Sequence, residues 1–169
     1  MHITRLFMMS VALAILAVNG SAQEKKIELT MVKYDGLKQE ILKHRGKVVI
    51  VDFWATNCIP CIQAFPHYVE LQKKHADKGL VVITVSVDPT DNKKRVDRAN
   101  TTLNENQVML RNLILDEPAE VWGKRFDGQS LPFAYLFDRR GKWVRFRASE
   151  TPNYDAMVEK TLLQMLDEK

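Results

Sequence analysis

The sequence predicts an α/β protein of three layers, in which helices cover both faces of a central mixed sheet. Two apolar, β-branched runs, Val48–Trp54 and residues 80–87, are typical of strands buried on both faces of a parallel sheet. Apolar residues at helical spacing lie between these runs, so this half of the chain predicts a βαβ unit. Phe133–Phe137 and Trp143–Arg147, joined by a short turn that ends at Gly141, predict a C-terminal antiparallel hairpin.

The other elements follow from the same periodicities and from glycine and proline stop signals. An insertion of about 44 residues separates the second buried strand from Pro132 and is expected to hold a helix, a strand and a second helix. The remaining expected elements are an edge strand in an N-terminal extension at 23–34, helices at 35–44, 92–103, 118–126 and 153–167, a long helix ending near Asp77, and a strand at 112–115.

Composition and charge indicate one ordinary folded domain. The chain has 169 residues, of which 46% are hydrophobic and 27% charged, and its net charge of +4 is too small to indicate nucleic-acid binding. Basic residues gather between Arg139 and Arg147, where alternation with apolar residues is typical of a half-buried strand near a sheet edge. A docking surface for an acidic partner is the alternative. Nothing in the sequence indicates an oligomer, and a monomer is expected.

The first 22 residues have the layout of a signal peptide. Arg5 precedes an apolar run of about 13 residues that is short for a bilayer span, and small residues follow up to Ala22. Cleavage after Ala22 would leave residues 23–169 as the mature domain, and a retained N-terminal anchor is the alternative. Export to the periplasm or another extracytoplasmic space would place both cysteines in an oxidising compartment.

The motif Cys58-Ile59-Pro60-Cys61 lies where a buried strand passes into a helix. The positive end of the helix dipole and its unpaired N–H groups stabilise a thiolate, which is the reactive form of cysteine. Cys58 is therefore expected to be the exposed nucleophile, and Cys61, deeper in the helix, to resolve the mixed disulfide. Pro60 fits the first turn because its missing N–H costs no helical bond there.

Other functions of a CxxC pair are less consistent with this sequence. Structural zinc needs four ligands, and the spacings of His44, His67 and His75 match no zinc-finger pattern. Covalent haem needs a histidine where Ile62 stands, and an iron–sulfur cluster needs more thiolates than two. A purely structural disulfide across so small a loop would remove little unfolded-state entropy. No metal or other cofactor is expected.

Residues 51–61, VDFWATNCIPC, resemble the active-site strand and loop of thioredoxins, and more specifically of exported thioredoxin-like proteins of the TlpA/ResA type. The run Ser130-Leu131-Pro132-Phe133 resembles the loop of this family in which a cis proline faces the cysteines. The likeness spans nearly the whole mature chain. It implies a three-layer thioredoxin fold for residues 23–169, with a strand and helix inserted before the cis proline.

The resemblance implies roles for four further residues. Asp52 would help to move the proton of Cys61, although a strand-end aspartate satisfied by nearby N–H groups is the alternative. Leu131 would offer its backbone to a substrate chain, like an added strand, beside the cis Pro132. An ordinary trans proline is the alternative at Pro132. Asp88 lies roughly where ResA-like proteins place an acidic residue, usually glutamate, but Asp88 before Pro89 also fits plain turn chemistry, which the sequence favours.

Three residues beside the cysteines are expected at the substrate groove. Trp54 is expected to be a packing residue that also lines the groove, whereas Ile59, with Pro60 next to it, is expected to contact the substrate.

The sequence thus predicts an exported thiol:disulfide oxidoreductase that reduces protein disulfides, as in cytochrome c maturation, and is recharged by a membrane electron donor. A disulfide oxidase or isomerase on the same fold is the first alternative, because the CxxC sequence does not determine the reduction potential. A thiol peroxidase is disfavoured because Ala55 stands where a peroxide-binding threonine is needed. A non-catalytic metal-binding thiol module is the remaining alternative.

Overall fold

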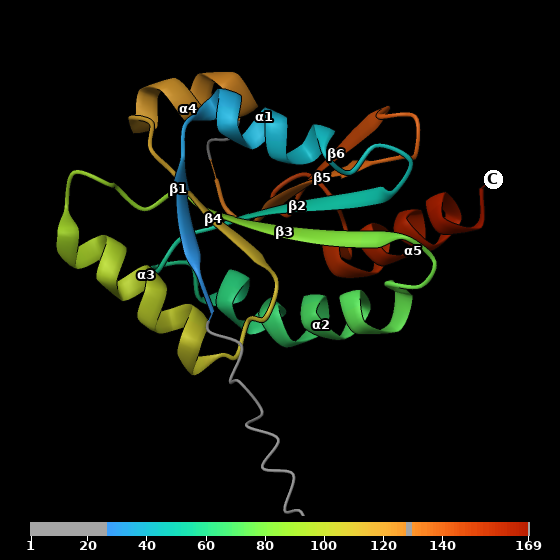
Figure 1. Ribbon diagram of the computed structural model, residues 1–169, viewed down its shortest axis with the longest axis horizontal. Coiled ribbons are helices and arrows are strands. Elements are labelled where there is room, and N and C mark those ends of the chain that lie inside the picture. The colour runs from blue at the N-terminus through green and yellow to red at the C-terminus, as the bar shows by residue number, and fades with distance from the viewer. Residues whose placement is uncertain (1–26, 128–129, 169) are drawn as a thin grey trace, which may run out of the picture.

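A computed structural model describes residues 27–127 and 130–168, which form a six-stranded sheet between two helical layers (Figure 1). The strands are β1 (Leu29–Val32), β2 (Val48–Trp54), β3 (Leu80–Ser86), β4 (Arg111–Leu115), β5 (Phe133–Phe137) and β6 (Trp143–Arg147). The helices are α1 (Tyr34–Leu42), α2 (Ile59–His75), α3 (Lys93–Glu105), α4 (Ala119–Phe126) and α5 (Tyr154–Asp167). The expected leader, residues 1–22, lies outside the described residues. Within them, no helix is both long and apolar enough to cross a bilayer.

The strand order β1-β4-β3-β2-β5-β6 confirms the predicted mixed sheet. The first four strands in this order, β1, β4, β3 and β2, pair in parallel. Strand β5 pairs antiparallel with β2, and β6 pairs antiparallel with β5. The predicted βαβ unit and C-terminal hairpin are therefore both present. The expected short edge strand within residues 23–34 is present, and among the described residues of that range Leu29–Val32 pair with β4.

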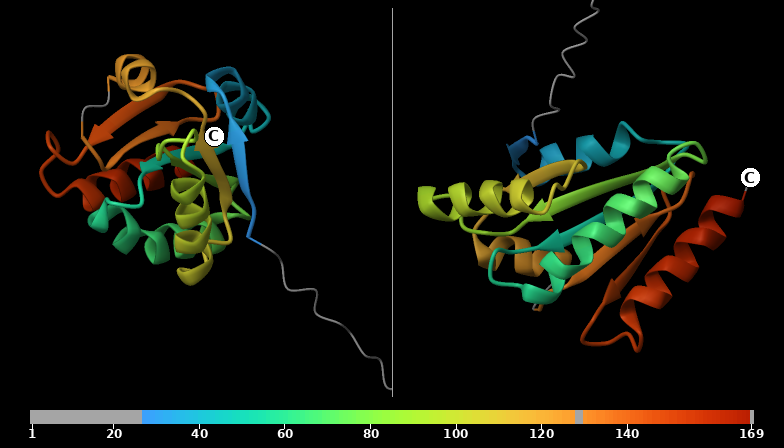
Figure 2. Two further views of the ribbon diagram at one scale, coloured as in Figure 1. Left: turned by 90° about the vertical axis from the view of Figure 1, so that its left-hand side faces the viewer. Right: turned by 90° about the horizontal axis from the view of Figure 1, so that it is seen from below.

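Strand β2 lies at the centre of the sheet, and all seven of its residues are buried. Helices α1 and α4 lie on one face of the sheet, and α2, α3 and α5 on the other (Figures 1 and 2). Because side chains alternate along a strand, Val49, Val51 and Phe53 pack under α1 and α4, while Val48 and Ile50 pack against α2 and α5. This two-sided burial explains why the strand is continuously apolar rather than alternating.

The insertion helix α3 packs beside the start of α2. Its residues Ala99 and Leu103 share a buried cluster with Trp54, Phe65 and Cys61. This contact gives the cysteine end of α2 an apolar support from the segment between β3 and β4.

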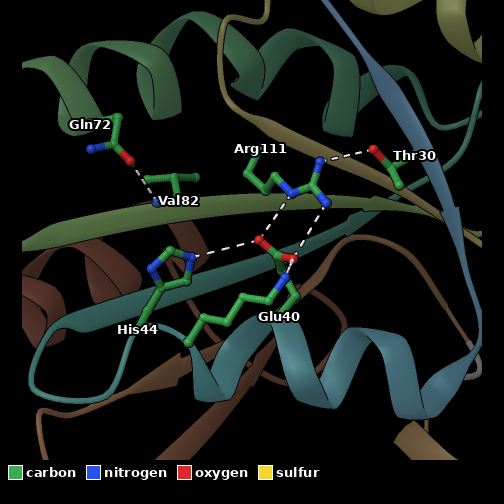
Figure 3. A network of polar contacts seen from close by, with 7 residues as sticks. Thr30, Glu40, His44, Gln72, Val82 and Arg111 are labelled. Atoms are coloured by element: carbon green, nitrogen blue, oxygen red, sulfur yellow. Dashed lines mark hydrogen bonds and ion pairs between the residues drawn. The ribbon is translucent and has the colours of Figure 1, made fainter.

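On the opposite face, a polar network attaches α1 to the sheet (Figure 3). The buried Glu40 carboxylate accepts a hydrogen bond from Arg111 of β4 at 3.0 Å, and the same guanidinium donates to Thr30 of β1 at 2.8 Å. Lys43 also donates to Glu40, at 3.0 Å. Burial raises the pKa of Glu40, but the hydrogen bonds and charges of Arg111 and Lys43 outweigh it and hold the pKa below its ordinary value. Glu40 is thus an ionised carboxylate whose charge is matched by its neighbours.

Candidate active site

The two cysteines are joined in a disulfide at the start of α2. Cys58 is the residue immediately before the helix, and Cys61 lies in its first turn, with Cα atoms 5.4 Å apart. The Ile62 N–H donates to the Cys58 carbonyl at 3.2 Å, which closes the first helical bond. The pair therefore occupies the positive end of the helix, where a thiolate is favoured.

The two sulfur-bearing residues differ in exposure. Cys58 retains 8% of its surface, whereas Cys61 retains 1% and packs against Trp54 and Phe65. The Cys61 Sγ lies 3.9 Å from the carbonyl oxygen of Phe53. Only Cys58 is therefore placed where an incoming disulfide can reach it.

A groove of about 660 Å³ opens beside Cys58. It brings together five of the residues expected at the site: Cys58, Ile59, Pro60, Asp88 and Leu131. The other residues that line it are Ala55, Asn57, Val87, Pro89, Arg95, Trp122 and Ser130. Ile59, which also lines the groove, is 67% exposed.

The Leu131–Pro132 loop forms one side of this groove. The bond between the two residues is cis, as expected. Phe133, the next residue, stacks on Phe53 with ring centroids 4.4 Å apart, and the Ala148 N–H donates to the Pro132 carbonyl at 3.1 Å. Among the described residues, neither the N–H nor the carbonyl of Leu131 has a hydrogen-bond partner. Its backbone is therefore available to an extended chain lying in the groove.

Asp88 is tied directly to the cysteine loop, which the turn interpretation favoured by the sequence did not anticipate. The buried carboxylate accepts hydrogen bonds from the Thr56 N–H at 2.8 Å, from the Thr56 hydroxyl at 2.7 Å and from the Ser86 hydroxyl at 2.9 Å. Thr56 stands two residues before Cys58. Asp88 therefore joins the end of β3 to the loop that carries the nucleophile.

Asp52 lies buried in β2, on the face that α2 covers. It is 1% exposed, and its Oδ2 has no hydrogen-bond partner among the described residues. Burial raises the pKa of Asp52 well above its ordinary value; the Tyr68 hydroxyl opposes the shift, and the nearby Asp155 carboxylate adds to it. The alternative for Asp52, a strand-end aspartate whose carboxylate is satisfied by local N–H groups, is not observed, because its Oδ2 has no such partner among the described residues. The arrangement leaves a buried acid one residue away from the carbonyl that contacts Cys61.

Trp54 does not line the groove, contrary to expectation. It is fully buried, with its indole edge-on to Phe65 at a centroid distance of 5.0 Å. Because side chains alternate along β2, Trp54 faces α2. Trp54 is therefore a packing residue, which was one part of the expectation. The groove wall instead includes Arg95 and Trp122, which sequence reasoning missed. Arg95 lies in the first turn of the helix after β3, and Trp122 in the first turn of the helix after β4. The carboxyl ends of parallel strands share one edge of a sheet, so the first turns of the helices that follow them are where such groove residues could have been predicted.

A family model described as the AhpC/TSA family matches residues 22–162. The chain belongs to the AhpC/TSA family. The thiol-disulfide oxidoreductase ResA of Bacillus cereus is 27% identical over 131 residues, which cover 73% of this chain and 72% of that protein.

Solved structures agree with this assignment. A Chlorobium tepidum protein assigned as a thiol:disulfide interchange protein DsbE is 29% identical, with a TM-score of 0.56, over 75% of this chain and 84% of that one. The thioredoxin domain of a thiol-disulfide oxidoreductase from Bacteroides vulgatus is 25% identical, with a TM-score of 0.56, over 72% and 84% of the two chains. The predicted thioredoxin-like fold and the thiol-disulfide oxidoreductase class are confirmed.

Replacing Asp52 by asparagine is expected to stabilise the oxidised protein in a pH-dependent way. The pKa of Asp52 is higher in the folded than in the unfolded protein, so at pH values between the two the folded state binds the proton more strongly. The free energy of unfolding therefore decreases as the pH rises through this range. Asp52→Asn removes this loss, so its free energy of unfolding should exceed that of the wild type by about 1–3 kcal/mol near pH 8 and by much less near pH 4.

Urea unfolding of both proteins at a series of pH values measures the difference. The exposed Asp91→Asn is the matched control and should show no such trend. A difference between Asp52→Asn and the wild type that does not grow with pH would show that the carboxyl is not perturbed by burial.

Proposed function

We propose that this protein is an exported disulfide reductase in which Cys58 attacks the substrate and Cys61 completes the exchange. One observation carries the proposal: of the two cysteines at the start of α2, only Cys58 lines the groove, and the same groove is lined by Leu131, whose N–H and carbonyl have no hydrogen-bond partner among the described residues. That arrangement suits the reduction of a disulfide within a polypeptide that lies extended across the site.

The first step forms a mixed disulfide. The Cys58 thiolate attacks one sulfur of the substrate disulfide, the substrate S–S bond breaks, and the second substrate sulfur leaves as a thiolate. The position of Cys58 just before α2 supports this assignment, because the helix N-terminus favours the anionic form.

The second step releases the substrate. The Cys61 sulfur, after losing its proton, attacks the Cys58 sulfur, so the mixed disulfide breaks and the Cys58–Cys61 disulfide forms. Two electrons have then passed to the substrate. Asp52 is the proposed acceptor of the Cys61 proton, because it is buried on the same side of β2 and adjoins Phe53, whose carbonyl lies 3.9 Å from Cys61 Sγ.

Substrate binding is proposed to use the two sides of the groove differently. Leu131 would pair its N–H and carbonyl with the backbone of the substrate chain, as in strand addition, which gives affinity for many sequences. The exposed Ile59 and the adjoining Pro60 would contact substrate side chains. The acidic Asp88 acts here as a positioning residue, because two of its hydrogen bonds hold Thr56, and hence the loop before Cys58, while the third ties it to Ser86 of β3.

The setting is proposed to be extracytoplasmic. Residues 1–22 would direct export and be removed after Ala22, or be retained as an anchor. A pair of thiols in an oxidising compartment must be reduced again after each turnover, so a membrane redox protein is the proposed electron donor. The resemblance to exported TlpA/ResA-type proteins supports reduction in cytochrome c maturation as the physiological role.

A thiol peroxidase is the second candidate, and the site argues against it. The hydroxyl of Thr56 donates to Asp88 and stands two residues before Cys58, while Ala55 occupies the place where such an enzyme needs threonine.

A metal-binding thiol module would instead bind a metal ion tightly and stoichiometrically when reduced, which a zinc titration measures.

Serine variants of the two cysteines test their separate roles. Cys61→Ser is expected to accumulate a mixed disulfide through Cys58, because the resolving thiol is absent, whereas Cys58→Ser should accumulate little. The measurement is a non-reducing gel of each reduced variant after incubation with a protein disulfide such as insulin. The nucleophile assignment is wrong if Cys58→Ser traps the substrate as well and Cys61→Ser traps none.

The proposed role of Asp52 predicts a selective kinetic defect. Reduced protein reacting with dithionitrobenzoate releases one thionitrobenzoate when Cys58 attacks and a second when Cys61 resolves, so the two steps are seen separately by absorbance. Asp52→Asn should slow the second release at least about tenfold near neutral pH and leave the first nearly unchanged, because only the resolving step loses its base. Asp91→Asn is the control. Equal slowing of both releases, or of neither, would contradict the role.

The direction of electron flow is tested by the reduction potential. Equilibration in thiol buffers, followed by alkylation and a gel-shift count of free thiols, should give a value near the reducing end, about −270 mV, as for thioredoxin. A value near about −120 mV would make the protein an oxidant and overturn the proposed direction without affecting the exchange chemistry.

A further inference from the structure

A second hollow, of about 450 Å³, lies on the α1 and α4 face of the sheet and shares no lining residue with the cysteine groove. Its floor is made by alternate residues of β2: Val49, Val51 and Phe53, none more than 2% exposed. Tyr135 and Phe137 of β5 extend this floor toward the hairpin. Val49, Val51 and Phe53 close the bottom of the hollow and are themselves shielded from water, whereas Tyr135 and Phe137 keep part of their surface exposed.

The hollow exists because α1 and α4 leave the hairpin end of this face uncovered. Tyr135 and Phe137 are only partly buried, and Trp143 of β6 is 59% exposed, although its ring lies against Tyr135 with centroids 5.3 Å apart. Leu42, at the end of α1, is 40% exposed on the other side of the opening. Large apolar side chains thus surround an opening that the fold itself does not fill.

Positive charge surrounds the same opening. Five cationic residues line the hollow: Lys38, Arg45, Lys47, Arg125 and Arg145. The first four are exposed and take part in none of the ion pairs formed among the described residues.

Nearby carboxylates balance only part of this charge, since Asp127 pairs with Arg145 at 3.3 Å but with none of the other four cations. Asp138 is the one carboxylate that lines the hollow, and its Oδ1 accepts the backbone N–H groups of Arg140 and Lys142 in the hairpin turn. Glu40, on the same helix as Lys38, does not line the hollow and is held by Arg111, as Figure 3 shows. The rim therefore keeps a surplus of positive charge above an apolar floor.

We propose that this hollow binds a small amphipathic anion, namely a carboxylate with an apolar body such as a medium-chain fatty acid. The volume is that of an ordinary small-molecule site, and the apolar body would lie against the exposed parts of Leu42, Tyr135 and Trp143, which removes apolar surface from water. The exposed guanidinium and ammonium groups at the rim would hold the carboxylate where it meets solvent.

Two other occupants fit these features less well. A second copy of the chain would bring the same five cations against themselves, and the whole chain already carries a net charge of +4. An acidic peptide would contact the charged rim, whereas a single aliphatic chain is better suited to cover the exposed Leu42 and Trp143 and the partly exposed Tyr135 beside it.

Binding of decanoate to the oxidised protein tests the proposal. Isothermal titration should show one saturable site, and decanol, which has the same chain length without the charge, should bind more weakly. Lys38→Gln and Arg125→Gln should each weaken decanoate binding about two- to fivefold, as expected for partly solvated charge pairs. Leu42→Glu, which adds a carboxylate at the opening, should weaken it further. All three substitutions are at exposed positions, and thionitrobenzoate release at the separate cysteine site should be unchanged.

The matched control is Lys160→Gln, which removes one exposed positive charge from α5 on the opposite face of the sheet and should leave decanoate binding as in the wild type. Four results would overturn the proposal. The first three are the absence of saturable decanoate binding, binding that the rim variants do not weaken, and concentration-dependent dimerisation that Leu42→Glu abolishes while decanoate does not bind. An acidic peptide that binds where decanoate does not would also exclude it.

Discussion

The two-sided burial of β2 is the constraint on which the rest of the structure depends. Every residue of this strand is enclosed, so its direction and end point are set by two helical layers and two neighbouring strands. Strand β2 ends at Trp54, where the chain leaves the sheet, and Cys58 and Cys61 follow within a few residues. A reactive group at that position inherits the rigidity of the core behind it.

The same constraint separates the two cysteines chemically. Burial of Trp54 and Phe65 beneath the first turn of α2 places Cys61 inside and leaves Cys58 at the surface. Asp52 is buried by the same packing, which raises the pKa of its carboxyl well above its ordinary value and so increases its affinity for a proton. Asp88 supplies the remaining fixed point, since its hydrogen bonds to Thr56 connect the cysteine loop to β3. The proposed nucleophile, resolving thiol and proton carrier thus acquire different environments from one packing arrangement.

The elements outside the βαβ unit determine what the site can recognise. The insertion contributes Arg95 and Trp122 to the groove, and the loop before β5 contributes Leu131. On the other face, the hairpin extends beyond the cover of α1 and α4, which leaves an apolar, cation-rimmed hollow at a distance from the sulfurs in the fold. The groove and the hollow therefore both lie where elements distant in sequence meet at the borders of the core.

The sequence by itself determined the strands, the helices and the chemistry. Uninterrupted β-branched residues identify Val48–Trp54 as a central strand, and the position of Cys58 between that strand and a helix indicates thiol chemistry, because both signals are local in the chain. Only the tertiary structure decided that Trp54 is buried, that Asp88 bonds the cysteine loop, and that Arg95 and Trp122 line the groove. The periodicity of a segment shows which of its side chains share a face, but the layer that covers that face comes from a distant part of the chain.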